Sequence, residues 1–269
     1  MKSRNVVLLG LMFFTCFSSA ETLVFGVVPQ QSAKKLAESW APMMAHLSEK
    51  TGKQIVFATA KDIPTFESRL AKSEYDIAYM NPYHFVVFSE RSGYRALARQ
   101  KNKRIRGIIV VPKASNIQSL ADLQGATLAF PAPAAFAATI IPQSTLAAMG
   151  IAVKAQYVSS HDSVYLNVSR NIFPAGGGVL RTFNATRADA RENLRILWKS
   201  PGYTPHAIAT AATVDEQTRA ALLYAMLNLN DDSNNQALLK GIAFSGFEKG
   251  QDKDWEDVRK LGIDRIKAK

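Results

Sequence analysis

The sequence predicts an α/β protein of two units, each with a mainly parallel sheet flanked by helices. Strand-like and helix-like segments alternate along most of the chain, which is typical of parallel sheets covered by helices on both faces. The alternation restarts near Gly107, which favours two units. The chain has 269 residues, of which 47% are hydrophobic, so it can bury the core that such an arrangement needs.

The first unit is predicted to alternate four strands with three helices. Strands are expected at 22–28, 54–58, 75–80 and 94–99, and helices at 33–51, 65–72 and 82–89. Ser32 precedes the first helix as a predicted N-cap, and Gly52 follows it as a stop. The apolar residues of this helix recur at intervals of three and four, which places them on one face: Leu36, Trp40, Met43, Met44 and Leu47.

The second unit begins with a strand at 107–111 and repeats the alternation. Helices are expected at 119–123, 136–149, 163–171 and 181–188, and strands at 127–130, 155–158, 176–180 and 194–198. The segment 199–205 contains two prolines and a glycine and is predicted to cross back to the first unit. The tail adds a strand at 207–210 and helices at 214–227, 234–241 and 252–261. The predicted lobes are therefore 21–107 with 204–269, and 108–203, joined by two hinge crossings.

The first twenty residues predict a cleavable secretory signal. Lys2 and Arg4 form a basic start, 6–17 is an apolar stretch, and 18–20 is a small-residue cleavage site. The mature chain is then expected to begin at Glu21 and to lie in the periplasm. Cleavage removes Cys16, the one cysteine of the sequence. Lipidation of that cysteine is the alternative, but a bulky Phe-Phe-Thr precedes it.

The charge of the chain favours an anionic partner without selecting one. Lys and Arg number 33 against 22 Asp and Glu, a formal charge of +11 that suits nucleic acid, anionic lipid or a small anion. An exported protein meets little nucleic acid, so no nucleic-acid partner is expected. The dense basic run at 101–106 is interpreted as a solvated loop.

Two predicted strand ends carry candidate anion-binding residues. Asn81, Tyr83 and His84 stand at the end of one strand and the start of a helix, where unpaired N–H groups favour anions. Ser160 and His161 have the same place in the second unit, with His161 as a hydrogen-bond donor. The alternative is that Asn81 and Ser160 only cap their helices.

Gly177 and Arg181 are further candidates. A run of three glycines at 176–178 lets backbone N–H groups approach a ligand closely, although tight packing of the strand explains it as well. Arg181 can pair with an anion or form a surface salt bridge.

Signatures of catalysis are missing from the sequence. It contains no Gly-x-Ser-x-Gly elbow and no His-Glu-x-x-His pair. The four histidines are too dispersed to argue for a metal site: His46, His84, His161 and His206. We therefore expect no enzyme, no metal and no cofactor.

Several motifs resemble those of the periplasmic phosphate, phosphite and phosphonate binding proteins of ABC uptake systems. They cover nearly all of the mature chain and comprise Phe25–Gln30, Trp40–Pro42, Tyr75–Pro82, Ser119–Gly125, Pro142 and Ser160–Asp162. The resemblance implies a two-lobed periplasmic-binding fold that closes on a small ligand. It also implies a monomer that passes the ligand to an ABC permease.

The resemblance places ligand contacts at Tyr83 or its neighbours, on the helix after Pro133, and at His161. The chain departs from the family at the second of these. Where phosphonate binders carry Ser-Thr-Ser-Gly, this chain has Ala135, Phe136, Ala137 and an alanine. The hydroxyl donors are absent, so the ligand class is left open as a phosphonate, another oxyanion or an organic anion. A ligand-sensing partner of a membrane histidine kinase or cyclase remains the alternative to transport.

Overall fold

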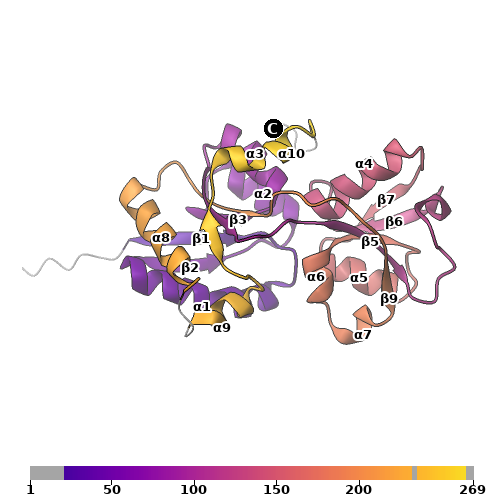
Figure 1. Cartoon of the computed structure of the whole chain (residues 1–269), viewed down its shortest axis with the longest axis horizontal. Helices are drawn as coiled ribbons and strands as arrows, with labels where there is room; N and C mark the ends of the chain where they lie inside the picture. Colours follow the sequence, from indigo (N-terminus) through magenta and orange to yellow (C-terminus); the bar gives the residue numbers. More distant parts are fainter. Residues whose placement is uncertain (1–20, 232–234, 265–269) are drawn as a thin grey trace, which may run out of the picture.

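The computed structural model describes residues 21–231 and 235–264 and shows two α/β lobes side by side (Figure 1). The predicted signal at 1–20, including Cys16, lies outside the described residues. None of the helices that the structure describes is long and apolar enough to span a bilayer.

The sheet of lobe 1 has six strands in the described part of the chain, in the order β11-β4-β10-β3-β1-β2. Strands β1, β2 and β3 pair in parallel, whereas β10 is antiparallel to both β3 and β4. Strands β1 to β4 therefore share one direction, and β10 and β11 reverse it. The strands are β1 (Thr22–Val27), β2 (Gln54–Ala58), β3 (Ile77–Met80), β4 (Arg95–Gln100), β10 (Ala207–Thr210) and β11 (Phe247–Lys249).

Helices cover both faces of this sheet. In Figure 1, α1, α8 and α9 lie on one side and α2, α3 and α10 on the other. Helix α1 has the predicted bounds, and Gly52 ends it with a φ of 68°. The helical segments are α1 (Ala33–Thr51), α2 (Ile63–Ala71), α3 (Pro82–Arg91), α8 (Glu216–Asn228), α9 (Gln236–Gly241), the 3₁₀ turn η4 (Asp252–Trp255) and α10 (Glu256–Arg259).

The sheet of lobe 2 has the order β7-β6-β8-β5-β9. Strands β6, β7 and β8 pair in parallel, and β5 is antiparallel to both β8 and β9. Both sheets are therefore mixed, although most strands of each point the same way. The reversed strands β5 and β10 directly follow the two connections between the lobes. The strands are β5 (Gly107–Pro112), β6 (Thr127–Phe130), β7 (Lys154–Tyr157), β8 (Gly176–Val179) and β9 (Leu194–Lys199).

Two helices of lobe 2 differ from the sequence prediction, since the one expected at 181–188 ends at Asn184 and a separate short helix begins at Ala188. The segment predicted as a continuous helix at 136–149 begins as the π-helix η2 (Phe136–Ile140) and continues as α4 (Ile141–Ala148). Its carbonyls press against the sheet, because a Cβ at Gly107 or Gly177 would lie well inside van der Waals contact with them. The other helical segments are η1 (Leu120–Leu123), α5 (His161–Ser169), α6 (Leu180–Asn184) and α7 (Ala188–Arg191).

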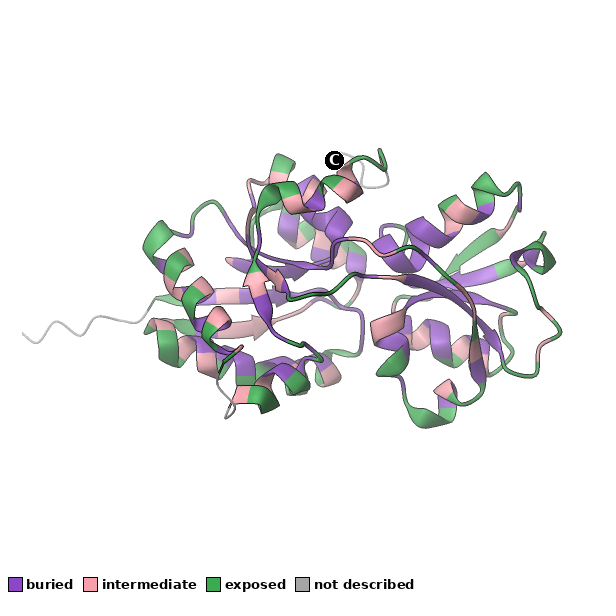
Figure 2. Cartoon of the chain, in the orientation of Figure 1, coloured by how far each residue is buried: buried purple, intermediate pink, exposed green. Residues whose placement is uncertain are grey.

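The two connections between the lobes pair with each other. Ile105 and Tyr203 form an antiparallel bridge, with N–O distances of 2.8 and 2.9 Å. The buried apolar cluster of lobe 1 extends across the junction and includes Phe136 and Val179 of lobe 2. Figure 2 shows buried residues reaching from both sheets to this junction. The lobes are thus in direct contact, and the candidate site lies between them.

Candidate ligand-binding site between the lobes

A small space, here called the inner pocket, lies where the carboxyl ends of β1 and β3 meet the N-termini of η2 and α5. It leaves only about 10 Å³ of free room, the space of one water molecule. Its lining is mostly apolar and comprises Val28, Gln30, Ile63, Asn81, Ile105, Ala135–Ala138, His161, Val179 and His206.

Direct hydrogen bonds hold the lobes together around the inner pocket. The backbone N–H of His161 donates to the carbonyl of Gln30 at 3.2 Å. Nδ2 of Asn81 donates to the carbonyl of Ala134 at 3.3 Å. At the rim, Nζ of Lys35 donates to the carbonyl of Ala185 at 2.6 Å. The structure therefore has the lobes closed on one another.

Of the three candidates at the start of α3, only Asn81 reaches the inner pocket. Asn81 also caps the helix, since its Oδ1 accepts from the N–H of His84 at 2.8 Å. Tyr83 is buried within lobe 1 and lines no described pocket. His84 lines neither space at the junction, and its Nε2 lies 3.0 Å from Oε1 of Glu67. The structure therefore does not bring Tyr83 and His84 to the site.

Ala135, Phe136 and Ala137 line the inner pocket. All three are buried, and the Phe136 ring packs edge-on against Tyr203 at 5.4 Å. None of the three side chains offers a hydroxyl donor at the first turn of η2. The N–H groups of a first helical turn have no partner within the helix, so they are the donors available here. The free volume of about 10 Å³ leaves no room for an oxyanion beside these donors.

His161 also lines the inner pocket and is held by lobe 2. Its Nδ1 lies 3.1 Å from Oγ1 of Thr182, which in turn lies 2.8 Å from the Tyr165 hydroxyl. Burial, assisted by the positive charge of Arg181, lowers the pKa of His161 to about 3. The ring is therefore neutral at neutral pH, and Nε2 is the nitrogen left for a ligand.

Two other sequence candidates have structural roles away from the inner pocket. Oγ of Ser160 caps α5 by accepting from the N–H of Ser163 at 3.1 Å. Gly177 allows the carbonyl of Ala138 and the ring of Phe130 to approach strand β8. For these two residues the alternatives of capping and strand packing describe what the structure shows.

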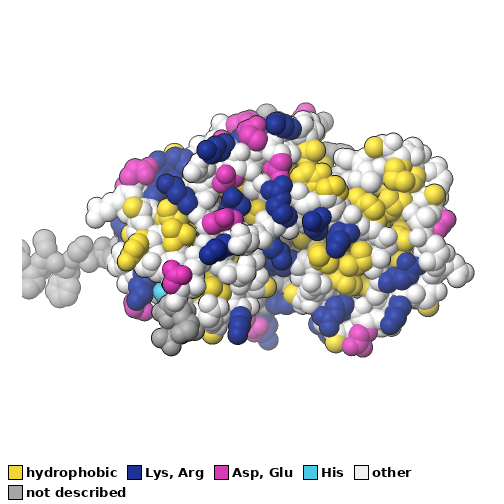
Figure 3. Space-filling view, in the orientation of Figure 1, with side chains coloured by type: hydrophobic (Ala, Val, Ile, Leu, Met, Phe, Trp, Pro, Cys, Tyr) yellow, Lys and Arg dark blue, Asp and Glu magenta, His cyan; other side chains and the backbone are white. Residues whose placement is uncertain are grey.

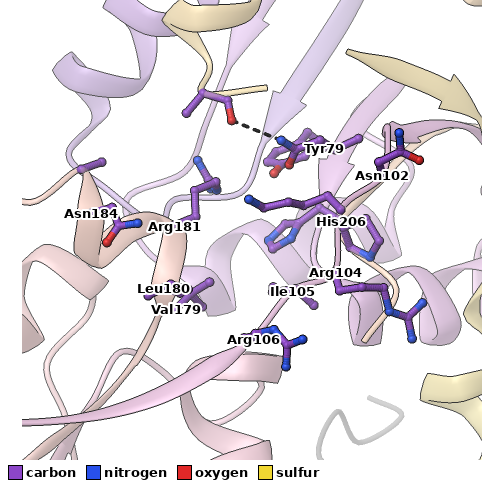
Figure 4. Close-up of a pocket in the computed structure, with 15 residues that line it drawn as sticks. Tyr79, Asn102, Arg104, Ile105, Arg106, Val179, Leu180, Arg181, Asn184 and His206 are labelled. Carbon is purple, nitrogen blue, oxygen red and sulfur yellow. Dashed lines mark hydrogen bonds between the residues drawn. The ribbon is translucent and has the colours of Figure 1, made fainter. Parts of the chain in front are cut away.

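A second, larger space, here called the arginine cavity, opens beside the inner pocket. Its volume is about 610 Å³. Figure 4 shows Arg104, Arg106 and Arg181 around it, and Figure 3 shows Lys and Arg side chains gathered along the junction of the lobes. The lining comprises Tyr79, Gln100, Asn102–Arg106, Val179–Arg181, Asn184, Ala185, Pro205, His206 and Ala243, none of them acidic.

The segment 101–104 is an exposed loop, as the sequence analysis expects, but part of the run also borders the arginine cavity. Lys103, Arg104 and Arg106 border the arginine cavity because this segment is the first connection between the lobes. The basic run was visible in the sequence. Only its position beside the predicted crossing could have indicated a role in the cleft.

His206 is a site residue that the sequence did not single out. Its ring stacks on Tyr79 at 4.9 Å and borders both spaces. Burial, together with the charge of Arg181, lowers the pKa of His206 well below its usual range. Its Nε2 is buried and has no hydrogen-bond partner among the described residues. It is thus a buried polar atom without a partner in the described structure, on a residue that lines both spaces.

A known family matches this architecture over most of the chain. Residues 25–255 match the model of the family described as "ABC transporter, phosphonate, periplasmic substrate-binding protein". The chain belongs to this family. Proteins of the family are the binding components of importers, and they work in the periplasm.

Individual relatives agree on the fold. A phosphate-import protein of Mycolicibacterium smegmatis is 21% identical over 67% of this chain and 63% of its own length, so less than two thirds of that relative is matched. A binding protein of an ABC phosphonate transporter from Pseudomonas aeruginosa superimposes with a TM-score of 0.83 at 17% identity, over 91% of this chain and 86% of its own. The structure of PhnD1 from Prochlorococcus marinus with methylphosphonate gives 0.84 at 17% identity, over 90% and 97%.

Proposed function

We propose that this protein is an exported solute-binding protein that closes its two lobes on a small anionic solute and delivers it to an ABC permease. The observation that carries the proposal is the arginine cavity, a space between the lobes with four cationic side chains and no carboxylate in its lining. A basic, partly desolvated cleft attracts and retains anions. Family membership supports the transport role.

The movable parts in this proposal are residues 21–107 with 204–269, and 108–203. The paired connections around Ile105 and Tyr203 are the hinge, since they are the narrowest link between the sheets. Ligand binding would hold the lobes in the contact seen here, where His161 meets Gln30. Closure of this kind is a common response of hinged two-domain proteins to a ligand.

The solute class is proposed from the site as well as from the relatives. Their names mention phosphate and methylphosphonate, and both are anions. In this chain Ala135, Phe136 and Ala137 offer no hydroxyl donors and leave almost no room. We therefore propose an organic anion, with inorganic phosphate and short phosphonates bound weakly. The protein is proposed to act as a monomer, without catalysis and without nucleic acid.

The most direct test is to identify the small molecule that co-purifies with the protein from its native host. Mass spectrometry of the denatured, filtered sample should show an anion that is returned unaltered. A neutral or cationic molecule would contradict the proposed solute class, and turnover of the molecule would contradict a binding role. N-terminal sequencing of the same sample should begin at or near Glu21, as cleavage of the proposed signal requires.

A further inference from the structure

We infer that the solute carries at least two anionic groups and binds in the arginine cavity, leaving the inner pocket filled by protein. This inference rests on the proposed function and names the chemistry of its solute. It assigns solute binding to the arginine cavity and not to the inner pocket.

The first step is the lack of room in the inner pocket. Its free volume of about 10 Å³ admits one water molecule and no phosphonate or carboxylate group. Phe136 and the alanines beside it are almost wholly buried, so they occupy the space themselves. A bound anion must therefore lie elsewhere in the closed protein. The neighbouring arginine cavity has about 610 Å³, within the range of about 300–1,000 Å³ that holds ligands of drug size.

The second step is the number of unneutralised cations. Among the described residues, three cations of the lining form no ion pair, namely Lys103, Arg106 and Arg181, and the two arginines are the ones that can bind an anionic group in a bidentate manner. Nη1 of Arg106 donates to the carbonyl of Ser200 at 3.0 Å, and Nη2 of Arg181 donates to Oε1 of Gln30 at 2.5 Å. Both acceptors are neutral, and each guanidinium retains further N–H donors. Arg104, in contrast, is paired with Asp257 at 2.7 Å.

The third step is the position of these two arginines. Arg181 belongs to α6 of lobe 2, whereas Arg106 belongs to the connection that leads into β5. In Figure 4 the two side chains lie apart on different segments of the wall. A guanidinium binds one carboxylate or phosphonate in a bidentate manner. Two separate, unpaired guanidiniums are therefore best matched by two anionic groups on one molecule.

The fourth step concerns the body of the solute. Apolar side chains of Ile105, Val179 and Leu180 form part of the wall near the arginines. His206 lines the same cavity, and its Nε2 is buried and has no partner in the described structure. The solute is thus expected to have an apolar spacer, with a hydrogen-bonding group opposite His206.

Isothermal titration calorimetry with a matched set of anions tests this inference. The mature chain, freed of bound solute, is titrated with methylphosphonate, propylphosphonate, propane-1,3-diphosphonate and the dicarboxylate glutarate. At least one two-headed anion should bind about 10-fold or more tightly than propylphosphonate, and the advantage should shrink as salt is raised. Diphosphonate and glutarate together show whether phosphorus is needed or only a pair of charges.

Variants connect the binding to the cavity. Arg106→Gln and Arg181→Gln should each lower the affinity for the two-headed anion by about 10- to 100-fold. The affinity for propylphosphonate should change less. Arg187→Gln is the matched control, because Arg187 is exposed on lobe 2 and paired with Asp189. The affinity of this variant for the two-headed anion should be unchanged. Thermal unfolding of each variant confirms that it is folded.

Three results would overturn the inference. The first is that a single-headed anion binds more tightly than a two-headed anion. The second is that the affinity for the two-headed anion does not change in the Arg106 and Arg181 variants. The third is that neither two-headed anion binds. The first two leave the proposed anion-binding function standing, since an anion still binds. In the third case the co-purified molecule decides the proposed function separately.

Discussion

At the scale of single residues, burial controls the charge of the cleft. His161 and His206 are almost fully buried near Arg181, and both the burial and that charge favour their neutral forms. The positive charge of the cleft therefore comes from Lys and Arg alone. Neutral histidines can still form hydrogen bonds, which is the contribution that Nε2 of His206 is placed to make.

The lowered pKa of His161 predicts acid sensitivity of the fold. The imidazole takes up a proton near pH 6.5 in the unfolded chain but only near about 3 in the native protein. Between these values the unfolded state binds more protons, so the free energy of unfolding falls as the pH falls. Its stabilisation is complete above pH 6.5. The contribution of one such histidine is about 1.4 kcal/mol per pH unit.

Urea denaturation at pH 7, 5 and 4 measures this dependence. His161→Gln, which cannot titrate, should lose less stability than the parent protein on acidification, by about 1 kcal/mol per pH unit. Equal slopes in the two proteins would contradict a neutral, buried His161.

At the scale of elements, the position of the π-helix η2 depends on the glycines of strand β8. The carbonyl of Ala138 lies so close to Gly177 that a side chain on the strand would push the helix away. This contact positions Phe136 over the inner pocket. The three glycines are thus explained by packing against η2 and α5, with Gly178 against Tyr165.

Gly177→Ala should therefore destabilise the protein, by about 1–3 kcal/mol as an overpacked core does. Gly241→Ala is the control, because the nearest atom to its added methyl group, the carbonyl oxygen of Ser39, lies at an ordinary 3.6 Å. Chemical denaturation of both variants gives the comparison. A loss of stability no larger for Gly177→Ala than for Gly241→Ala would contradict the close contact.

The first turn of η2 provides a second prediction at this scale. Replacing Ala135, Phe136 and Ala137 by Ser, Thr and Ser should make room in the inner pocket and add three hydroxyl donors. Affinity for methylphosphonate should then rise, since each hydrogen bond to a charged oxygen contributes about 1.5–3 kcal/mol before the costs of rearrangement. The control retains Phe136 and changes only the two alanines. Calorimetry showing no gain in the triple variant would place specificity elsewhere.

Local patterns in the sequence predicted most of these elements but less of the site. Strands 54–58, 127–130 and 207–210 have the predicted bounds, because residue type and spacing determine them locally. Strand β11 was missed, since Phe247 is the one apolar residue in its three positions. The π-helix η2 could not be predicted either. It depends on glycines at 107 and 177, which are distant in sequence.

The same distinction applies to the candidate site. Asn81 and His161 stand at predicted strand ends, and the structure brings both to the junction of the lobes. Arg104, Arg106 and His206 carry no local motif. They meet there because the two connections pair at Ile105 and Tyr203, and this is a property of the tertiary fold. The sequence pattern likewise did not predict whether a side chain at the start of a helix, such as His84, reaches the site.

At the scale of the whole molecule, two lobes meet at the paired connections, with the basic cavity between them. The contacts that close the structure, such as His161 N–H to the Gln30 carbonyl, are few and mostly involve backbone groups. Arg181 of lobe 2 also donates to Oε1 of Gln30 in lobe 1, and the remaining N–H donors of Arg181 and Arg106 can hold an anion in the closed cleft. The solute is therefore the component that stabilises the closed form.

Small-angle scattering tests this central claim most directly. The mature chain is measured after removal of bound solute, and again with the co-purified molecule restored at saturation. The account predicts a smaller radius of gyration with the solute bound, and a smaller change for Arg181→Gln at the same solute concentration. An unchanged radius of gyration at saturation would contradict closure of the lobes on an anion.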